Sequence, residues 1–124
     1  MYRVILTALI LLCTGTALSQ DNASHHDRQL VDLYRDVIAY RSAQGHNQVR
    51  PLAVYLRDRF LAGGFAAQDV RYLPMGDENA ALVVRYRGQG KTDTKPVLFM
   101  AHMDIVDALP EDWLRDPYAL IEED

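Results

Sequence analysis

Two polar side chains that can serve metal or proton chemistry stand close together after a strongly apolar run. His102 and Asp104 follow residues 97–101, whose sequence is VLFMA. In an extended segment, residues two positions apart point to the same side. A neutral imidazole is a good zinc ligand, and a nearby carboxylate can orient it or raise its basicity. The pattern is that of one half of a metal site, in which His102 would be the ligand and Asp104 the carboxylate that orients it.

Spacing alone leaves a simpler interpretation open. His-x-Asp occurs often by chance, and a surface histidine beside a turn-forming aspartate would look the same. The neighbouring histidines His25 and His26 are a second pair that can bind a metal. They lie in a polar segment, residues 20–27, which we expect to be a flexible lead-in, so we interpret them as solvated rather than ligating.

Two helices are predicted ahead of the candidate site. From residue 28 to residue 41 apolar side chains recur at helical spacing, with Asp27 as a plausible N-cap and Gly45 as a plausible stop. A second helix has Pro51 in its first turn and ends at residues 63–64, which are both glycine. We interpret the two apolar stripes as core; they consist of Leu30, Leu33, Tyr34, Val37 and Ile38 in the first helix and Leu52, Tyr55, Leu56 and Phe60 in the second.

Three strands are predicted after the glycines, because the apolar period changes to two. They cover residues 70–73, residues 80–87 and residues 96–101, and the last has the composition of a strand buried on both faces. The order of elements predicts an α/β fold in which helices pack on a mainly parallel or mixed sheet. Ligands in open α/β sheets bind beyond the carboxyl ends of strands, which is where His102 falls.

Residues 1–19 have the organisation of a secretory signal peptide. Arg3 precedes an apolar run at residues 4–12, and the small residues Ala17 and Ser19 are spaced as signal peptidase requires, which predicts cleavage before Gln20 and export to the periplasm or the medium.

Two other interpretations of this segment are weaker. An uncleaved anchor helix would need about 20 apolar residues to cross a bilayer, and this run is shorter. A lipoprotein site would use Cys13, but Leu12 stands where such sites have a small residue. We therefore expect no stable membrane anchor.

Composition narrows the function classes further. The chain has 124 residues, of which 49% are hydrophobic, so it forms one globular domain at most and is not a disordered tail. Lysine and arginine number 13 against 17 acidic residues, and this formal net charge of -4 excludes nucleic-acid binding driven by a basic surface. A single cysteine excludes an intramolecular disulfide and the Cys-rich zinc modules.

The region from residue 97 to residue 118 resembles the first metal motif of a family of zinc metallopeptidases. That family includes aminoacylase, carboxypeptidase G, acetylornithine deacetylase and succinyl-diaminopimelate desuccinylase. The matching residues are His102, Asp104, Val106, Trp113, Asp116, Pro117 and Tyr118. The two leading helices, the Gly-Gly-Phe turn at residues 63–65 and the strand at residues 82–86 are similar too, so the resemblance covers nearly all of residues 20–124.

The resemblance implies a zinc-exopeptidase-like fold and amide-bond hydrolysis. By it, His102 would bind one of two Zn²⁺ ions, Asp104 would orient that histidine, and the substrate would be a peptide or an N-acyl amino acid. It also allows a homodimer of the full-length protein. Trp113 would belong to the scaffold, or alternatively line the cleft, and Arg115 would be solvated.

The remaining family residues have no match in this sequence. These are a Gly-Arg-Gly turn, a metal-bridging aspartate, a Glu-Glu pair that supplies the general base, and later ligands. Glu122 and Glu123 precede the expected bridging aspartate and are not that pair. We therefore expect residues 20–124 to be the N-terminal portion of a catalytic domain, inactive as an isolated chain. The alternatives are a secreted non-catalytic α/β binding module and a domain whose resemblance to the family is only structural.

Overall fold

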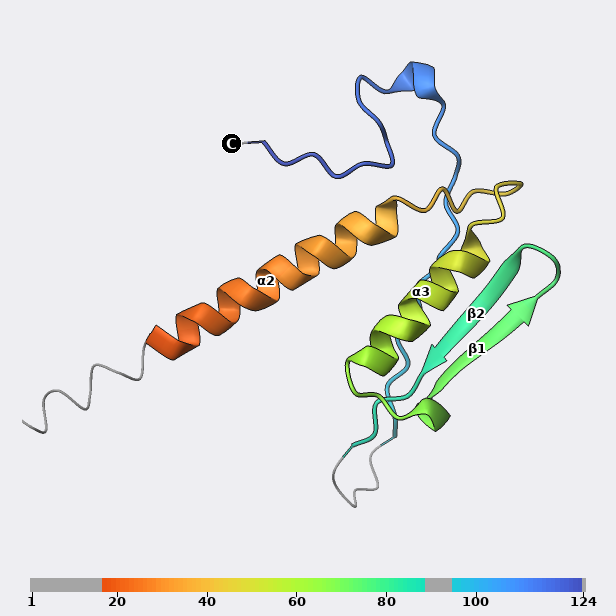
Figure 1. The fold of residues 1–124 in the computed structure, drawn as a ribbon. Coiled ribbons are helices and arrows are strands. Elements are labelled where there is room, and N and C mark those ends of the chain that lie inside the picture. Colours follow the sequence, from red (N-terminus) through yellow and green to blue (C-terminus); the bar gives the residue numbers. More distant parts are fainter. Residues whose placement is uncertain (1–16, 89–94, 124) are drawn as a thin grey trace, which may run out of the picture. The chain divides into compact units, whose positions relative to one another are not determined.

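The computed structural model describes residues 17–88 and residues 95–123 (Figure 1). Within them lie the helices α2 (Ala17–Ile38) and α3 (Val49–Ala62), the strands β1 (Val70–Met75) and β2 (Asn79–Val84), and the short 3-10 helices η1 (Ala67–Asp69) and η2 (Pro110–Asp112). The predicted mixture of helices and sheet is confirmed. The sheet differs from the mainly parallel or mixed one predicted, since the two paired strands in the described residues are antiparallel.

The chain divides into two compact units, Met1–Val37 and Ile38–Asp124. In the first unit α2 is longer than predicted, because residues 20–27 are helical and Asp27 lies inside the helix. Residues 17–27 contain neither glycine nor proline, so the helix propagates through the potential cap. Residues 1–16 of the predicted signal peptide lie outside the described residues.

The apolar stripe of α2 is not core in this structure. Leu30 and Tyr34 are 65% and 56% exposed, so the interpretation of these residues as core is wrong here. On the polar side, Asp32 accepts a hydrogen bond from Arg35 at 2.6 Å, one turn along the helix. The helix ends at Ile38, before the predicted stop at Gly45. No helix among the described residues is long and apolar enough to span a membrane.

In the second unit, α3 matches its prediction. The glycines end it as expected: the Gly63 N–H bonds the carbonyl of Arg59, and Gly64 has a φ of 91°, which glycine adopts without steric cost. Leu52 and Ala53 on this helix are buried, at 3% and 0% exposure. They form the centre of a small core, because α3 packs along both strands of the hairpin (Figure 1).

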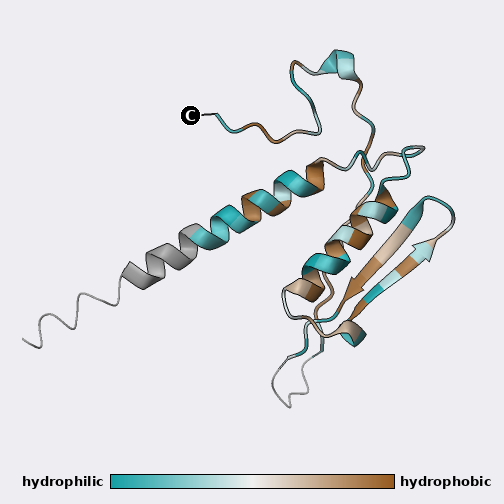
Figure 2. Ribbon diagram, in the orientation of Figure 1, coloured by the Kyte–Doolittle hydropathy of each residue, from teal (hydrophilic) through white to brown (hydrophobic). Residues whose placement is uncertain are grey.

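The hairpin confirms the first two predicted strands, with shifted ends. Its register runs from Val70 opposite Val84 to Met75 opposite Asn79. Gly76 opens the connecting turn with a φ of 57°. Strand β2 is mostly apolar along its length (Figure 2), and Val70 and Ala80 contribute to the core. The turn that connects the two strands lines the cavity of the candidate site, which is described below.

The third predicted strand, residues 96–101, is not a strand. This segment pairs with neither β1 nor β2, and its apolar side chains are exposed, up to 90% for Phe99. A strand that is apolar on both faces requires a backbone partner and cover on each face. The described residues supply neither, and the prediction of a buried strand is wrong for this structure.

Candidate functional site

His102 and Asp104 lie next to each other in an extended, exposed segment. The Nδ1 atom of His102 is 2.6 Å from the main-chain oxygen of Asp104 and 3.6 Å from its Oδ1. A carbonyl oxygen only accepts hydrogen bonds, so this contact places the proton of a neutral ring on Nδ1 and leaves the lone pair on Nε2. Nε2 has no hydrogen-bond partner among the described residues, and the side chain is 82% exposed. The ring therefore presents the nitrogen through which a histidine can bind a metal.

Ser42 holds the backbone on both sides of Asp104. Its hydroxyl donates to the carbonyl of Met103 at 2.7 Å, and its own carbonyl accepts from the N–H of Ile105 at 3.4 Å. Ser42 is only 2% exposed. The loop between α2 and α3 thus contacts the candidate motif directly.

Asp107 anchors the same segment through three side chains. Arg41 approaches in a fork, with Nε 2.6 Å from Oδ1 and Nη2 2.7 Å from Oδ2. The Tyr118 hydroxyl donates to Oδ1 at 2.8 Å, and His46 Nε2 lies 3.1 Å from Oδ2. The hydrogen bonds from Arg41, Tyr118 and His46 hold the pKa of Asp107 far below its usual range, against a smaller opposing effect of desolvation. Asp107 is therefore a permanent anion near neutral pH and is not a proton acceptor for catalysis.

Tyr118 also secures the chain just after Asp107. Its hydroxyl oxygen accepts from the N–H of Ala108 at 3.1 Å, and its ring lies 5.6 Å from the Arg41 guanidinium carbon. Asp116 Oδ1 accepts from the N–H of Tyr118 at 2.9 Å. The Asp-Pro-aromatic part of the sequence motif thus acts as scaffold for the segment that follows His102 and Asp104.

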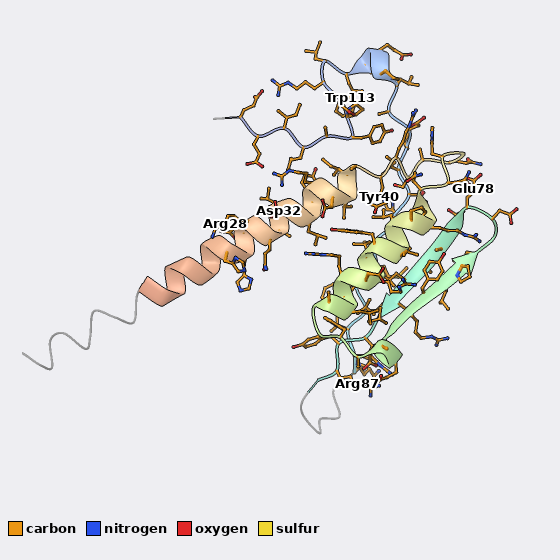
Figure 3. All side chains as sticks on the ribbon, viewed as in Figure 1. Arg28, Asp32, Tyr40, Glu78, Arg87 and Trp113 are labelled. Atoms are coloured by element: carbon orange, nitrogen blue, oxygen red, sulfur yellow. The ribbon has the colours of Figure 1, made fainter. Side chains whose placement is uncertain are left out.

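A cavity of about 720 Å³ opens beside Asp104. One side is the segment from Asp104 to Asp107, and the opposite side is the hairpin turn that carries Asp77 and Glu78. The turn is tied to the α2–α3 loop, because Glu78 Oε2 accepts from the N–H of Gly45 at 2.9 Å (Figure 3). His102 is not among the lining residues, so the structure brings only Asp104 of the predicted pair to the cavity.

Carboxylates dominate the charge of this cavity. Asp77, Glu78, Asp104 and Asp107 line it together with amides, small residues and larger apolar side chains, and the lining includes neither lysine nor arginine. The negative charge of Asp107 is offset by Arg41. The other three carboxylates give the cavity a negative charge that attracts cations.

The remaining sequence candidates lie apart from this cavity. Trp113, labelled in Figure 3, follows η2. It is 54% exposed and is not among the residues that line this cavity. Arg115 is not simply solvated, because it forms an ion pair with Glu123. His25 and His26 are exposed on α2, with ring centroids 6.2 Å apart.

A second ion cluster ties η1 to the chain after β2. Asp69, 6% exposed, accepts from Arg85 Nε at 2.7 Å and from Arg87 Nε at 2.7 Å. The hydrogen bond from Arg87, followed by that from Arg85, lowers the pKa of Asp69. The cluster fixes the end of the hairpin near η1. None of its three residues lines the cavity beside Asp104.

The pair His102 and Asp104 fits one part of a zinc site and does not complete one. A zinc ion takes four ligands in structural sites, and three protein ligands in catalytic sites. In the part of the chain that the structure describes, no group of three or more His, Cys, Asp or Glu residues is placed to hold a metal ion. Further ligands would have to come from outside these residues.

Sequence reasoning missed the residues that hold the motif in place. Arg41, Ser42 and His46 lie more than 60 positions before their partners, and no periodic pattern links them to the motif. The one available signal was Asp107 itself, an additional acid three residues after Asp104 in an otherwise apolar stretch.

Comparisons with models of protein families, with curated proteins and with solved structures found no match to this chain.

Proposed function

We propose that this chain carries the first metal-ligand motif of an exported zinc-dependent hydrolase with a zinc-exopeptidase-like fold. The reaction would be hydrolysis of an amide bond in a peptide or an N-acyl amino acid. His102 would bind zinc through Nε2, and Asp104 would fix the ring. The observation that supports this proposal best is the 2.6 Å contact of His102 Nδ1 with the Asp104 carbonyl oxygen, which leaves Nε2 available to a ligand.

The roles assigned to the pair follow from ordinary ligand chemistry. Histidines that bind metals usually give their second ring nitrogen to a carboxylate or a carbonyl, which fixes the tautomer and the ring orientation. Here one residue, Asp104, offers both groups within 3.6 Å of Nδ1. In such hydrolases zinc polarises the scissile carbonyl. Because the described residues provide an incomplete ligand set, the chain by itself would bind zinc weakly and would be inactive.

A secreted binding module without catalytic activity is the second candidate. The observation that favours it is the acidic cavity beside Asp104, which is formed without any metal ligand set. A binding module would keep its cavity ligand after His102 is replaced, whereas a zinc hydrolase would lose its metal.

The test uses the natural gene product recovered from the exported fraction. Zinc content and hydrolysis of dipeptides and N-acyl amino acids would be measured for the wild type, His102→Ala and His26→Ala. The last variant removes an exposed histidine of α2 and serves as the matched control. We expect His102→Ala alone to lose zinc and nearly all turnover. Full zinc content and normal turnover in His102→Ala would overturn the proposal.

A further inference from the structure

We infer that Ser42 is a positioning residue for the pair His102 and Asp104. The inference rests on the proposed role of that pair, but its geometry is independent of any metal. Ser42 acts through the main chain of Met103 and Ile105, to which it is hydrogen-bonded.

The contacts of Ser42 reproduce one step of a parallel strand pairing. In such a step, one residue donates from its N–H to the residue before its opposite and accepts at its C=O from the residue after it. Here the opposite residue is Asp104, and the carbonyl of Ser42 accepts from Ile105 as the pattern requires. The N–H of Ser42 is already bonded to the Tyr40 carbonyl at 2.8 Å. The hydroxyl takes its place and donates to Met103 at 2.7 Å.

In this arrangement the Ser42 hydroxyl is needed to hold the backbone around Asp104. The two peptide groups that flank Asp104 are both held, so the backbone dihedral angles of Asp104 are restricted. The Asp104 carbonyl belongs to the second of these peptide groups, so the same hydrogen bonds orient the oxygen that contacts the His102 ring and fixes its tautomer. Water has little access to replace the hydroxyl, because Ser42 is 2% exposed. Loss of the hydroxyl would therefore leave a carbonyl without its partner.

The neighbouring contacts hold the segment at a second point. Arg41 and His46, on either side of Ser42, both contact Asp107. These ion pairs attach the segment beyond Asp104, so removal of the Ser42 hydroxyl should loosen residues 102–105 without releasing residue 107. The expected loosening is confined to residues 102–105. A residue that served only general stability would instead loosen the whole unit when replaced.

The experiment is nuclear magnetic resonance of the full chain without added metal, with ¹⁵N-labelled histidine. The His102 ring signals, assigned with His102→Ala, report its tautomer. Wild type would be compared with Ser42→Ala, with Ser42→Thr, which keeps the hydroxyl, and with Ala53→Gly, which weakens the α3 core at a buried residue. Amide hydrogen exchange of Ile105 would be measured in the same samples.

We expect Ser42→Ala to shift the His102 ring signals toward a mixture of tautomers. The exchange of the Ile105 amide should become about tenfold faster, which is the effect expected when the segment loses the stabilisation of one hydrogen bond. Ser42→Thr should keep both signals near those of the wild type, and Ala53→Gly should leave the tautomer unchanged. Unchanged His102 signals in Ser42→Ala, or an equal change in Ala53→Gly, would overturn the inference.

The wild type alone supplies a further check if a variant does not fold. Its Ile105 amide should exchange more slowly than the amides of the exposed residues 97–100, and equal rates would also overturn the inference. Failure of the proposed function is seen separately, as retained zinc and turnover in His102→Ala. The signals that test Ser42 require neither zinc nor activity.

Discussion

Arg41 and Asp107, 66 positions apart in the sequence, form a forked ion pair with contacts of 2.6 Å and 2.7 Å. The planar guanidinium matches both carboxylate oxygens, a geometry that a lysine would not reproduce. His46 and Tyr118 bind the same carboxylate. The relationship explains how a segment without regular secondary structure keeps a defined position beside the α2–α3 loop.

Asp107 should make the protein sensitive to acid. Its folded pKa lies below the unfolded value of about 3.9, so its stabilisation is present above about pH 4 and is lost as the pH falls toward the folded pKa. Asp107→Asn should therefore be less stable than the wild type near pH 7, and the difference should narrow in strong acid. Urea unfolding at several pH values measures this. Asp69, whose pKa is also lowered, is present in both proteins and cancels in the comparison.

Tyr118→Phe should cost less than Asp107→Asn. The change removes only the hydroxyl, which donates to Asp107 and accepts from Ala108, and leaves the ring over Arg41. We expect a loss of at most about 1.5–3 kcal/mol in the free energy of unfolding, the range for a hydrogen bond to a charged group. Denaturant titration of both variants gives the ranking. A larger loss for Tyr118→Phe would contradict the central position of Asp107 in the cluster.

Leu52→Ala should destabilise the second unit much more than Trp113→Ala. Leu52 is 3% exposed at the centre of a small core, and the typical cost of such a truncation is about 2–5 kcal/mol. A buried tryptophan would cost about 3–5 kcal/mol, but Trp113 is 54% exposed, so its replacement should cost clearly less. Thermal unfolding followed by circular dichroism compares the two. Equal losses would mean that Trp113 is covered in solution.

Zinc titration calorimetry should find only weak binding by the chain after removal of residues 1–19. One imidazole and one adjacent carboxylate are too few for a tight site, which requires three or four ligands. A tight one-to-one site that survives replacement of His25 and His26 but disappears in His102→Ala would show that further ligands exist. In the natural gene product, Asp104→Ala should retain more metal than His102→Ala and lose about 10–100-fold in activity, because the carboxylate 3.6 Å from His102 Nδ1 is lost while the main-chain carbonyl contact remains.

Export should remove the N-terminal segment before Gln20. The basis is the order of Arg3, the apolar run and the small residues Ala17 and Ser19. N-terminal sequencing of protein from the periplasm or medium checks the position of cleavage. A protein that still begins at Met1 and is found in the membrane fraction would contradict the prediction and favour an anchor helix.

The sequence by itself predicted the elements whose determinants are local. Helix α3 and its glycine stop were correct because proline, glycine and apolar spacing act within a few residues. The two hairpin strands were found for the same reason, and their ends moved because pairing decides where a strand stops. The start of α2 was missed because Asp27 resembles a cap, yet the residues before it also form a helix.

Tertiary structure decided what surrounds the candidate motif. The apolar run at residues 96–101 predicted a buried strand, but burial depends on partners, and none of the described elements pairs with it or covers it. The assignment of His102 and Asp104 stays a prediction, which rests on the resemblance of residues 97–118 to a family motif and not on spacing alone. Their supports, Arg41 and Ser42, were not predicted, because a contact across more than 60 residues leaves no local pattern and exists only once the loop and the segment meet.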